Sequence, residues 1–167
     1  MATSSSLRVL RRFLAPARLL AVPRRGLADA EASSGSTFPL TFSGPHSAFY
    51  NSAPVAQVDV PATSGNFGIR PNHVPVLAVL KPGVVTVMED TKQSKYFVSS
   101  GTVTVNGDAS VQIIAEEAAP LDHFDIQAAR QGLEQCQQRT SSSSSDEDKT
   151  EAMIGAEVYE ALVKALE

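Results

Sequence analysis

Between residues 37 and 117 the chain alternates apolar and polar positions with a period of two. At the start of this stretch Phe38, Leu40 and Phe42 alternate with smaller or polar residues, which is the pattern of a strand with one buried face. Pro39 within that run predicts an edge strand, because proline cannot donate a hydrogen bond to a neighbouring strand. Further runs rich in β-branched residues predict strands over 49–50, 55–60, 76–80, 84–88, 95–99, 102–105 and 110–115.

Turn signals separate these runs. Lys81-Pro82-Gly83 combines a fixed φ with a permissive glycine and predicts a corner between two strands. Asn106-Gly107 lies between alternating runs, which is the strongest short-range signal of a β-hairpin. We therefore expect residues 37–118 to form an antiparallel β-sandwich or barrel.

After Ala119-Pro120 the apolar period becomes helical. Asp122 with Asp125 three residues later predicts a helix start at Asp122, and the first helix is expected to end at Arg139. The serine run at 140–145 predicts a polar loop, and a second apolar stripe follows it to the C-terminus. Residues 119–167 are thus predicted to form an antiparallel hairpin of two helices, which makes the whole chain an α+β protein.

The stretch Gly65–Pro75 contains two glycines, two prolines and an Asn-His pair. These residues disfavour a helix or a central strand, so we expect a shaped loop at one end of the sandwich that contacts a partner. Phe67 and Ile69 are expected to point inward as anchors, whereas alternate residues point outward. The candidate partner-contact residues are Asn66, Phe67, Gly68, Arg70, Asn72 and His73.

Residues 1–28 differ from the rest of the chain, because they contain six arginines, interleaved leucines and no acidic residue. This composition is typical of a mitochondrial presequence, and the arginines exclude a transmembrane helix. A surface helix of the mature protein is the alternative interpretation of the same pattern. Residues 29–36 are small and polar and are expected to form a disordered tail.

Removing this segment changes the charge of the protein. Without the six arginines, 8 of the 14 basic residues remain against 18 acidic ones, a net charge of about −10. Such a charge disfavours nucleic acid as a ligand, so the partners are expected to be proteins. The single cysteine, Cys136, excludes an internal disulfide and a cysteine zinc site, in keeping with a reducing compartment.

The sequence predicts no catalytic residue, metal site or cofactor. The three histidines, His46, His73 and His123, are far apart and lack metal-ligand spacing, and no phosphate-binding loop is present. We interpret Glu116-Glu117 as a solvated strand end rather than an acid–base pair, which needs a cleft to shift its pKa values. The serine run is interpreted as a solvated linker, with phosphorylation as the alternative.

Four motifs resemble one family over most of the chain. They are Gly65–Ile69, His73–Pro75, Leu80–Gly83 and Tyr96–Gly101, and their order and spacing are similar to those of the delta/epsilon subunits of F-type ATP synthases, called delta in mitochondria and epsilon in bacteria and chloroplasts. The resemblance extends from Thr37 to the C-terminus.

This resemblance implies a non-catalytic central-stalk (rotor) subunit of the mitochondrial proton-translocating ATP synthase. In the family the sandwich packs against the gamma subunit and the loop matching Gly65–His73 lies at the ring of c subunits, so rotation of the ring is coupled to ATP synthesis. A small epsilon subunit packs there in mitochondria. The implied location is the matrix side of the mitochondrial inner membrane, with the chain peripheral to the membrane.

One departure from the family limits what the resemblance implies. Some bacterial relatives bind ATP through an Ile/Leu-Asp-x-x-Arg-Ala motif, and the matching stretch here, Phe124–Ala129, has Ala128 at the arginine position. We therefore expect no nucleotide binding by the hairpin. The alternative to a rotor subunit is a free-standing β-sandwich binding module or assembly factor of the mitochondrial matrix.

Overall fold

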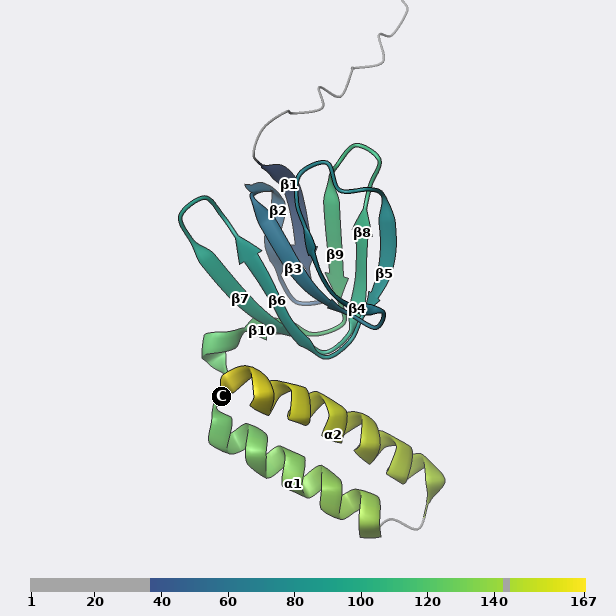
Figure 1. Cartoon of the computed structure of the whole chain (residues 1–167). Helices are drawn as coiled ribbons and strands as arrows, with labels where there is room; N and C mark the ends of the chain where they lie inside the picture. Colours follow the sequence, from purple (N-terminus) through teal and green to yellow (C-terminus); the bar gives the residue numbers. More distant parts are fainter. Residues whose placement is uncertain (1–36, 143–144) are drawn as a thin grey trace, which may run out of the picture. The chain divides into compact units, whose positions relative to one another are not determined.

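The computed structural model describes residues 37–142 and 145–167. The predicted presequence (1–28) and the predicted tail (29–36) lie outside these residues. The described part contains ten strands followed by helices (Figure 1). The elements are β1 (Phe38–Ser43), β2 (Ala48–Val55), β3 (Gln57–Ala62), β4 (Gly65–Ile69), β5 (Val76–Leu80), β6 (Gly83–Met88), β7 (Gln93–Val98), β8 (Gly101–Val105), β9 (Val111–Ala115), β10 (Ala118–Pro120), the 3-10 helix η1 (Leu121–His123), α1 (Ile126–Ser142) and α2 (Asp146–Leu166).

The strands form one sheet that folds over itself into two layers (Figure 1). One layer has the order β10-β7-β6-β3-β4 and the other the order β5-β8-β9-β1-β2. The layers are continuous where β3 pairs with β5 through Ala62 and Leu80. Beside this pair, the Lys81 N–H of the corner between β5 and β6 donates to the Pro61 carbonyl at 3.0 Å. The predicted β-sandwich and its corner at Lys81-Pro82-Gly83 are therefore confirmed.

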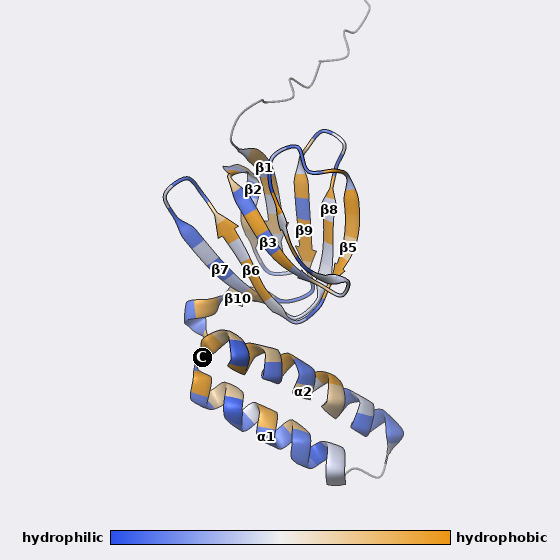
Figure 2. Ribbon diagram, viewed as in Figure 1, coloured by the Kyte–Doolittle hydropathy of each residue, from blue (hydrophilic) through white to orange (hydrophobic). Residues whose placement is uncertain are grey.

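The hydrophobic core lies between the two layers and is built by alternation along each strand. On β1, Phe38, Leu40 and Phe42 are buried, whereas the residues between them are partly exposed. Figure 2 shows apolar bands alternating with polar ones along several strands. Complete burial of one such side chain stabilises the fold by about 1.5–3 kcal/mol, so the alternation fixes which face of each strand points inward.

Two predictions about the strands are wrong. β1 is not an edge strand, because it lies between β2 and β9 and pairs with β9 in parallel. Pro39 is tolerated because it pairs with Pro54 of β2 and lies before the β9 ladder, which begins at Leu40. The first half of the predicted loop is also a strand, since β4 pairs with β3 along its whole length.

The helices confirm the predicted hairpin but not its start. The helix α1 begins at Ile126, and the Asp125 carboxylate accepts a hydrogen bond from the Gln127 N–H at 2.8 Å. Asp125 rather than Asp122 therefore caps the helix, and η1 occupies the preceding residues. At its other end α1 extends beyond the predicted Arg139 into the serine run, where the Ser142 hydroxyl donates to the Gln138 carbonyl at 2.8 Å.

Small side chains let the two helices pack closely. A Cβ atom at Gly132 would lie 2.6 Å from the Tyr159 ring, so the glycine makes room for that ring. The described residues fall in one compact unit, and a second apolar cluster joins the hairpin to the outer face of the sandwich. Its buried members are Phe97, Ala129 and Leu162, which pack with Val84 and Phe124 among others. The hairpin thus rests on the β6–β7 side of the sheet.

Candidate partner-contact surface

The structure separates the six predicted partner-contact residues into two groups. Asn66, Phe67 and Gly68 lie on β4, whereas Arg70, Asn72 and His73 form the turn after it. A strand rises by about 3.3 Å per residue, so Asn66 and Arg70 are roughly 13 Å apart along the chain direction. One partner side chain therefore cannot touch all six residues.

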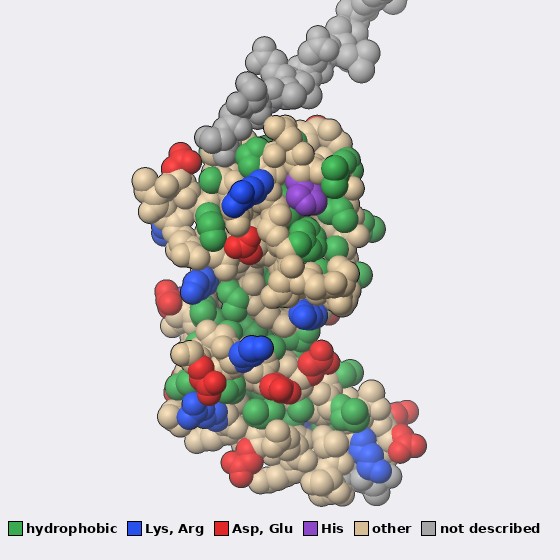
Figure 3. Space-filling view, in the orientation of Figure 1, with side chains coloured by type: hydrophobic (Ala, Val, Ile, Leu, Met, Phe, Trp, Pro, Cys, Tyr) green, Lys and Arg blue, Asp and Glu red, His purple; other side chains and the backbone are tan. Residues whose placement is uncertain are grey.

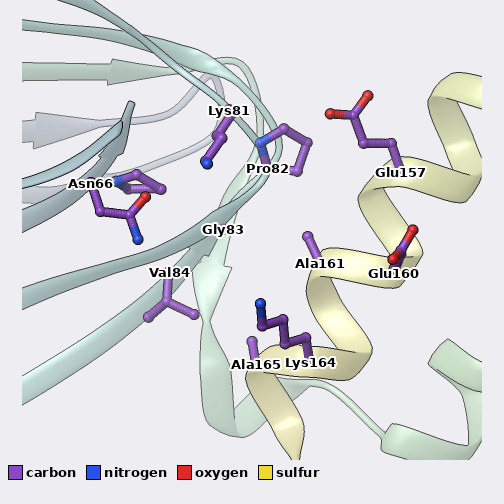
Figure 4. A pocket seen from close by; sticks show the side chains of 11 residues that line it. Asn66, Lys81, Pro82, Gly83, Val84, Glu157, Glu160, Ala161, Lys164 and Ala165 are labelled. Carbon is purple, nitrogen blue, oxygen red and sulfur yellow. The ribbon is translucent and has the colours of Figure 1, made fainter. Parts of the chain in front are cut away.

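Asn66 faces the hairpin rather than the turn. It lines a hollow of about 490 Å³ together with Lys81 and Pro82 of the corner and residues of α2. In Figure 4 Glu157 and Lys164 of α2 lie across this hollow from the corner. The hollow is thus bounded by both parts of the described chain.

The turn after β4 is held in one conformation. The His73 N–H donates to the Arg70 carbonyl at 3.1 Å, and Asn72 adopts a left-handed φ of 63°, which asparagine tolerates better than most residues. The His73 ring lies 6.1 Å from the Phe67 ring, and its Nδ1 is 2.8 Å from the Val74 carbonyl oxygen. The predicted loop is therefore a short fixed turn over residues 70–75.

A chain of hydrogen bonds fixes the Arg70 side chain. Its Nε–H donates to Gln57 Oε1 at 2.9 Å, and Gln57 Nε2 donates to Asp59 Oδ1 at 2.7 Å. Because a carboxylate only accepts hydrogen bonds, Asp59 determines which end of the Gln57 amide faces Arg70. Gly68 lies opposite Asp59 on the paired strand, and a Cβ atom at Gly68 would lie 2.6 Å from Asp59 Oδ1. The glycine therefore leaves room for this hydrogen-bond chain.

An apolar groove of about 540 Å³ separates β4 from β5. Phe67 and His73 line it on the β4 side, and Leu77 and Val79 line it on the β5 side. In the described chain β4 pairs only with β3, and β5 pairs along its length only with β8. The groove thus lies between two strand edges on the open side of the sandwich.

The outer face of the layer next to this groove carries exposed aliphatic side chains and no charged residue. Leu77 is 71% exposed, Val79 55% and Ile114 60%. Strand register places Val79, Thr102 and Ile114 in one row across β5, β8 and β9. None of the strands β1, β2, β5, β8 and β9 contains Asp, Glu, Lys or Arg. We call the outer side of these five strands the uncharged face.

Charged residues lie around the uncharged face and on the hairpin. The turns that border it contain Lys81, Asp108, Glu116 and Glu117. In Figure 3 hydrophobic side chains follow one margin of the sandwich, while many Asp and Glu side chains lie over the helices. An apolar centre within a polar rim is the anatomy of a protein interface.

Two titratable groups have pKa values that their surroundings shift. Burial raises the pKa of Tyr50 above its usual range, and its hydroxyl donates to Glu89 at 3.1 Å. Hydrogen bonds from Ser110 lower the pKa of Asp108 in an exposed turn. The described residues contain no group of His, Cys, Asp and Glu side chains that could hold a metal ion.

The uncharged face was not predicted from the sequence, although one signal could have indicated it. β5 reads Val-Leu-Ala-Val-Leu, so it is apolar at both alternating sets of positions. In an antiparallel sheet with one solvated face such a run must expose some of its apolar side chains. The exposure of Leu77 and Val79 follows from this pattern.

Comparison with known proteins places this geometry in one family. The family model described as ATP synthase, Delta/Epsilon chain, beta-sandwich domain matches residues 37–121. The chain is similar to "ATP synthase subunit delta, mitochondrial" of Caenorhabditis elegans, with 45% identity over 153 residues that cover 89% of this chain and 93% of that one. It is 44% identical to the protein of the same name from Agaricus bisporus over 147 residues, 88% of each chain.

Solved structures show the same fold. A chain in the cryo-EM structure of the Euglena gracilis mitochondrial ATP synthase, described as OSCP/F1/c-ring in rotational state 1, superimposes with a TM-score of 0.74 at 25% identity. The match covers 80% of this chain and 83% of that chain, so it includes residues of the hairpin as well as the sandwich.

Proposed function

The chain belongs to the ATP synthase delta/epsilon chain family, and on this premise we propose that it is a central-stalk (rotor) subunit of the mitochondrial proton-translocating ATP synthase. In this role it couples rotation of the c-ring to the gamma subunit, and so proton flow to ATP synthesis. It has no catalytic residues of its own and works as part of the complex.

One observation carries this proposal: the similarity to mitochondrial delta subunits includes both parts of the chain. The curated relatives match over almost nine-tenths of the sequence, whereas a binding module that shared only the sandwich would match to about residue 121. The Euglena structure contains F1 and the c-ring together with the similar chain. This supports a place for this protein in a complex with F1 and the c-ring.

The architecture suits a part that transmits torque. Backbone pairing of β3 with β5 connects the strands of the two layers, and close-packed interiors deform little. Partner surfaces can therefore be held in fixed positions on opposite sides of one rigid body. The hairpin adds a further surface through its contact with the outer face of β6 and β7.

The proposed partners are the gamma subunit, the small epsilon subunit and the c-ring. The uncharged face and the groove beside it are suited to a protein partner, since apolar side chains exposed within a polar rim mark such contacts. The six predicted contact residues remain part of the proposal, with Arg70, Asn72 and His73 at the turn and Asn66 beside the hairpin. Phe67 and Gly68 lie on β4 between Asn66 and the turn.

The proposed location is the matrix side of the mitochondrial inner membrane, where the chain is peripheral and attached through the c-ring. Mitochondrial delta subunits are its relatives. Within residues 37–142 and 145–167, neither α1 nor α2 combines the length and hydrophobicity that crossing a membrane requires.

A native gel of solubilised mitochondria tests this proposal. The chain should co-migrate with the gamma subunit and the c-ring, and a detergent that removes peripheral stalk proteins should leave it with them. A matrix protein that migrates freely serves as the control. Migration of the whole pool as a free protein would instead support the alternative, a free-standing matrix binding module or assembly factor.

A further inference from the structure

Arg70 is a positively charged side chain held in place without a neutralising partner. Its Nε–H is bound by Gln57, and no residue that the structure describes accepts a hydrogen bond from its Nη groups. The only ion pair between described residues joins Arg130 and Glu167. Arg70 is exposed, so its fork of Nη donors is oriented toward solvent.

The fork has a chemical preference. A guanidinium group binds a carboxylate through two parallel hydrogen bonds, and fixing its orientation beforehand reduces the entropy lost on binding. Gln57 supplies this fixation, and Asp59 in turn fixes the Gln57 amide. Because Gln57 binds the Nε–H, the edge of the guanidinium with the two Nη groups remains available for such a pair.

The Arg70 side chain extends over β3 to Gln57 and does not line the groove, but the turn that Arg70 begins leads to exposed apolar side chains. Arg70 and His73 are the ends of one hydrogen-bonded turn, and Val74, the next residue, is 70% exposed. His73 lines the groove whose other wall includes Leu77. Arginine is among the residues enriched in binding hot spots, and here it lies in the same turn region as the exposed Val74.

This inference rests on the proposed function. We propose that the turn from Arg70 to Val74 and the groove between β4 and β5 bind one segment of a stalk partner, which presents a carboxylate to Arg70 and an apolar side chain to the groove. The carboxylate pairs with the Arg70 Nη groups, and the apolar side chain occupies the groove against Phe67 and Leu77. Gln57 is a positioning residue in this site.

The charges around the site favour a protein over an anionic lipid surface. Asp108 borders the uncharged face at its Val76 end, and Glu116 and Glu117 border it at its Leu80 end. These three acids outnumber the two nearby cations, Lys81 and Arg70. This acidic border repels a negatively charged membrane, whereas a protein surface can place basic side chains opposite it. A single carboxylate opposite Arg70 is compatible with such a surface.

The test measures the affinity of the full-length mature chain for stalk complex from which this subunit has been removed, at several salt concentrations. Arg70→Gln should weaken binding about tenfold and reduce the salt dependence, because an ionic contact is lost. Arg70→Lys keeps the charge without the fork and should remain about threefold weaker than wild type. Leu77→Ser should weaken binding about fivefold with an unchanged salt dependence.

Arg139→Gln is the matched control, since Arg139 is an exposed arginine on α1 with no ion pair in the described chain, and it should bind like wild type. Wild-type affinity and salt dependence in Arg70→Gln would overturn this inference alone. Arg70-dependent binding to protein-free vesicles of anionic phospholipid would overturn it in favour of a membrane site. Absence of wild-type binding to the stalk complex would overturn both this inference and the proposed function.

Discussion

At the scale of single residues, Gly101 has the most demanding position in the sandwich. Its φ of 151° lies in a region that residues with side chains rarely adopt, and a Cβ atom there would overlap the Ile114 carbonyl oxygen. Because this neighbour is backbone of the paired strand β9, it cannot rotate away. Glycine at position 101 therefore allows β8 to begin close to the backbone of β9.

Gly101→Ala should lower the free energy of unfolding by about 2–4 kcal/mol, since it combines backbone strain with overlap of backbone atoms. Gly107→Ala is the control, because Gly107 has an ordinary φ and open space around its Cβ position. Urea denaturation followed by circular dichroism compares the two variants. Equal stability of both would show that the β8–β9 contact at Gly101 is looser than described.

Gly68 has a different role, because its φ is not in the positive range. The importance that we expect for Gly68 therefore rests on the room it leaves for the Asp59 side chain, and not on backbone strain. Gly68→Val would crowd Asp59, release Gln57 and so free the Arg70 side chain. We predict little loss of fold stability, about 1 kcal/mol or less, but reduced ATP synthesis per unit of proton-motive force in reconstituted vesicles. Normal coupling by assembled Gly68→Val complexes would contradict a functional contact at this turn.

At the scale of elements, the sequence allowed prediction of those features that depend on local chemistry. The hairpin at Asn106-Gly107 and the corner at Lys81-Pro82-Gly83 were predicted from turn residues, although Ala109, with φ 64°, takes the left-handed position in that hairpin. The inward direction of Phe67 and Ile69 followed from alternation and is confirmed. Each of these features is decided within a few residues.

Features that depend on distant pairing could not be predicted. β4 is a strand because β3 offers it a full ladder, and its glycine-containing sequence alone disfavours a strand. The parallel pairing of β1 with β9 likewise joins segments about 70 residues apart. In the candidate site the hydrogen bond from Arg70 to Gln57 depends on the same β3–β4 pairing. The geometry of this hydrogen bond could therefore not be predicted from local sequence patterns.

The start of α1 gives a test that separates the sequence interpretation from the structure. Asp125→Ala removes the side-chain bond to the Gln127 N–H and should lower the unfolding free energy by about 1 kcal/mol. Asp122→Ala should change it by less than about 0.5 kcal/mol, because Asp122 lies in η1 and makes no such bond. Helix content and urea midpoints measure both effects, and the reverse order would restore Asp122 as the cap.

At the scale of the whole molecule, the mature protein is expected to lack the arginine-rich segment. We predict an N-terminus within a few residues of Leu27–Asp29, because the acid-free composition ends there. Mass spectrometry of the chain from purified mitochondria determines this terminus. A mature chain beginning at Met1 would mean that the basic segment belongs to the working protein, and the net charge of the mature subunit would then be −4.

The sandwich and the hairpin should contribute unequally to function. Most of the buried residues lie between the two sheet layers, whereas the hairpin rests on the outer face through a smaller cluster. A chain that ends at Leu121 should therefore fold and keep the uncharged face and the Arg70 turn. We expect it to couple better than Gly68→Val does in the full-length chain.

The most direct test of the central claim is proton-driven ATP synthesis by vesicles that contain complex depleted of this subunit. Rotor coupling predicts that the depleted complex makes little ATP per unit of proton-motive force. Full-length chain should restore synthesis, and the chain ending at Leu121 should restore most of it, with native gels confirming assembly. Unchanged synthesis by the depleted complex would contradict a place in the rotor, and restoration only by chains that contain the hairpin would move the functional contact from the sandwich to the helices.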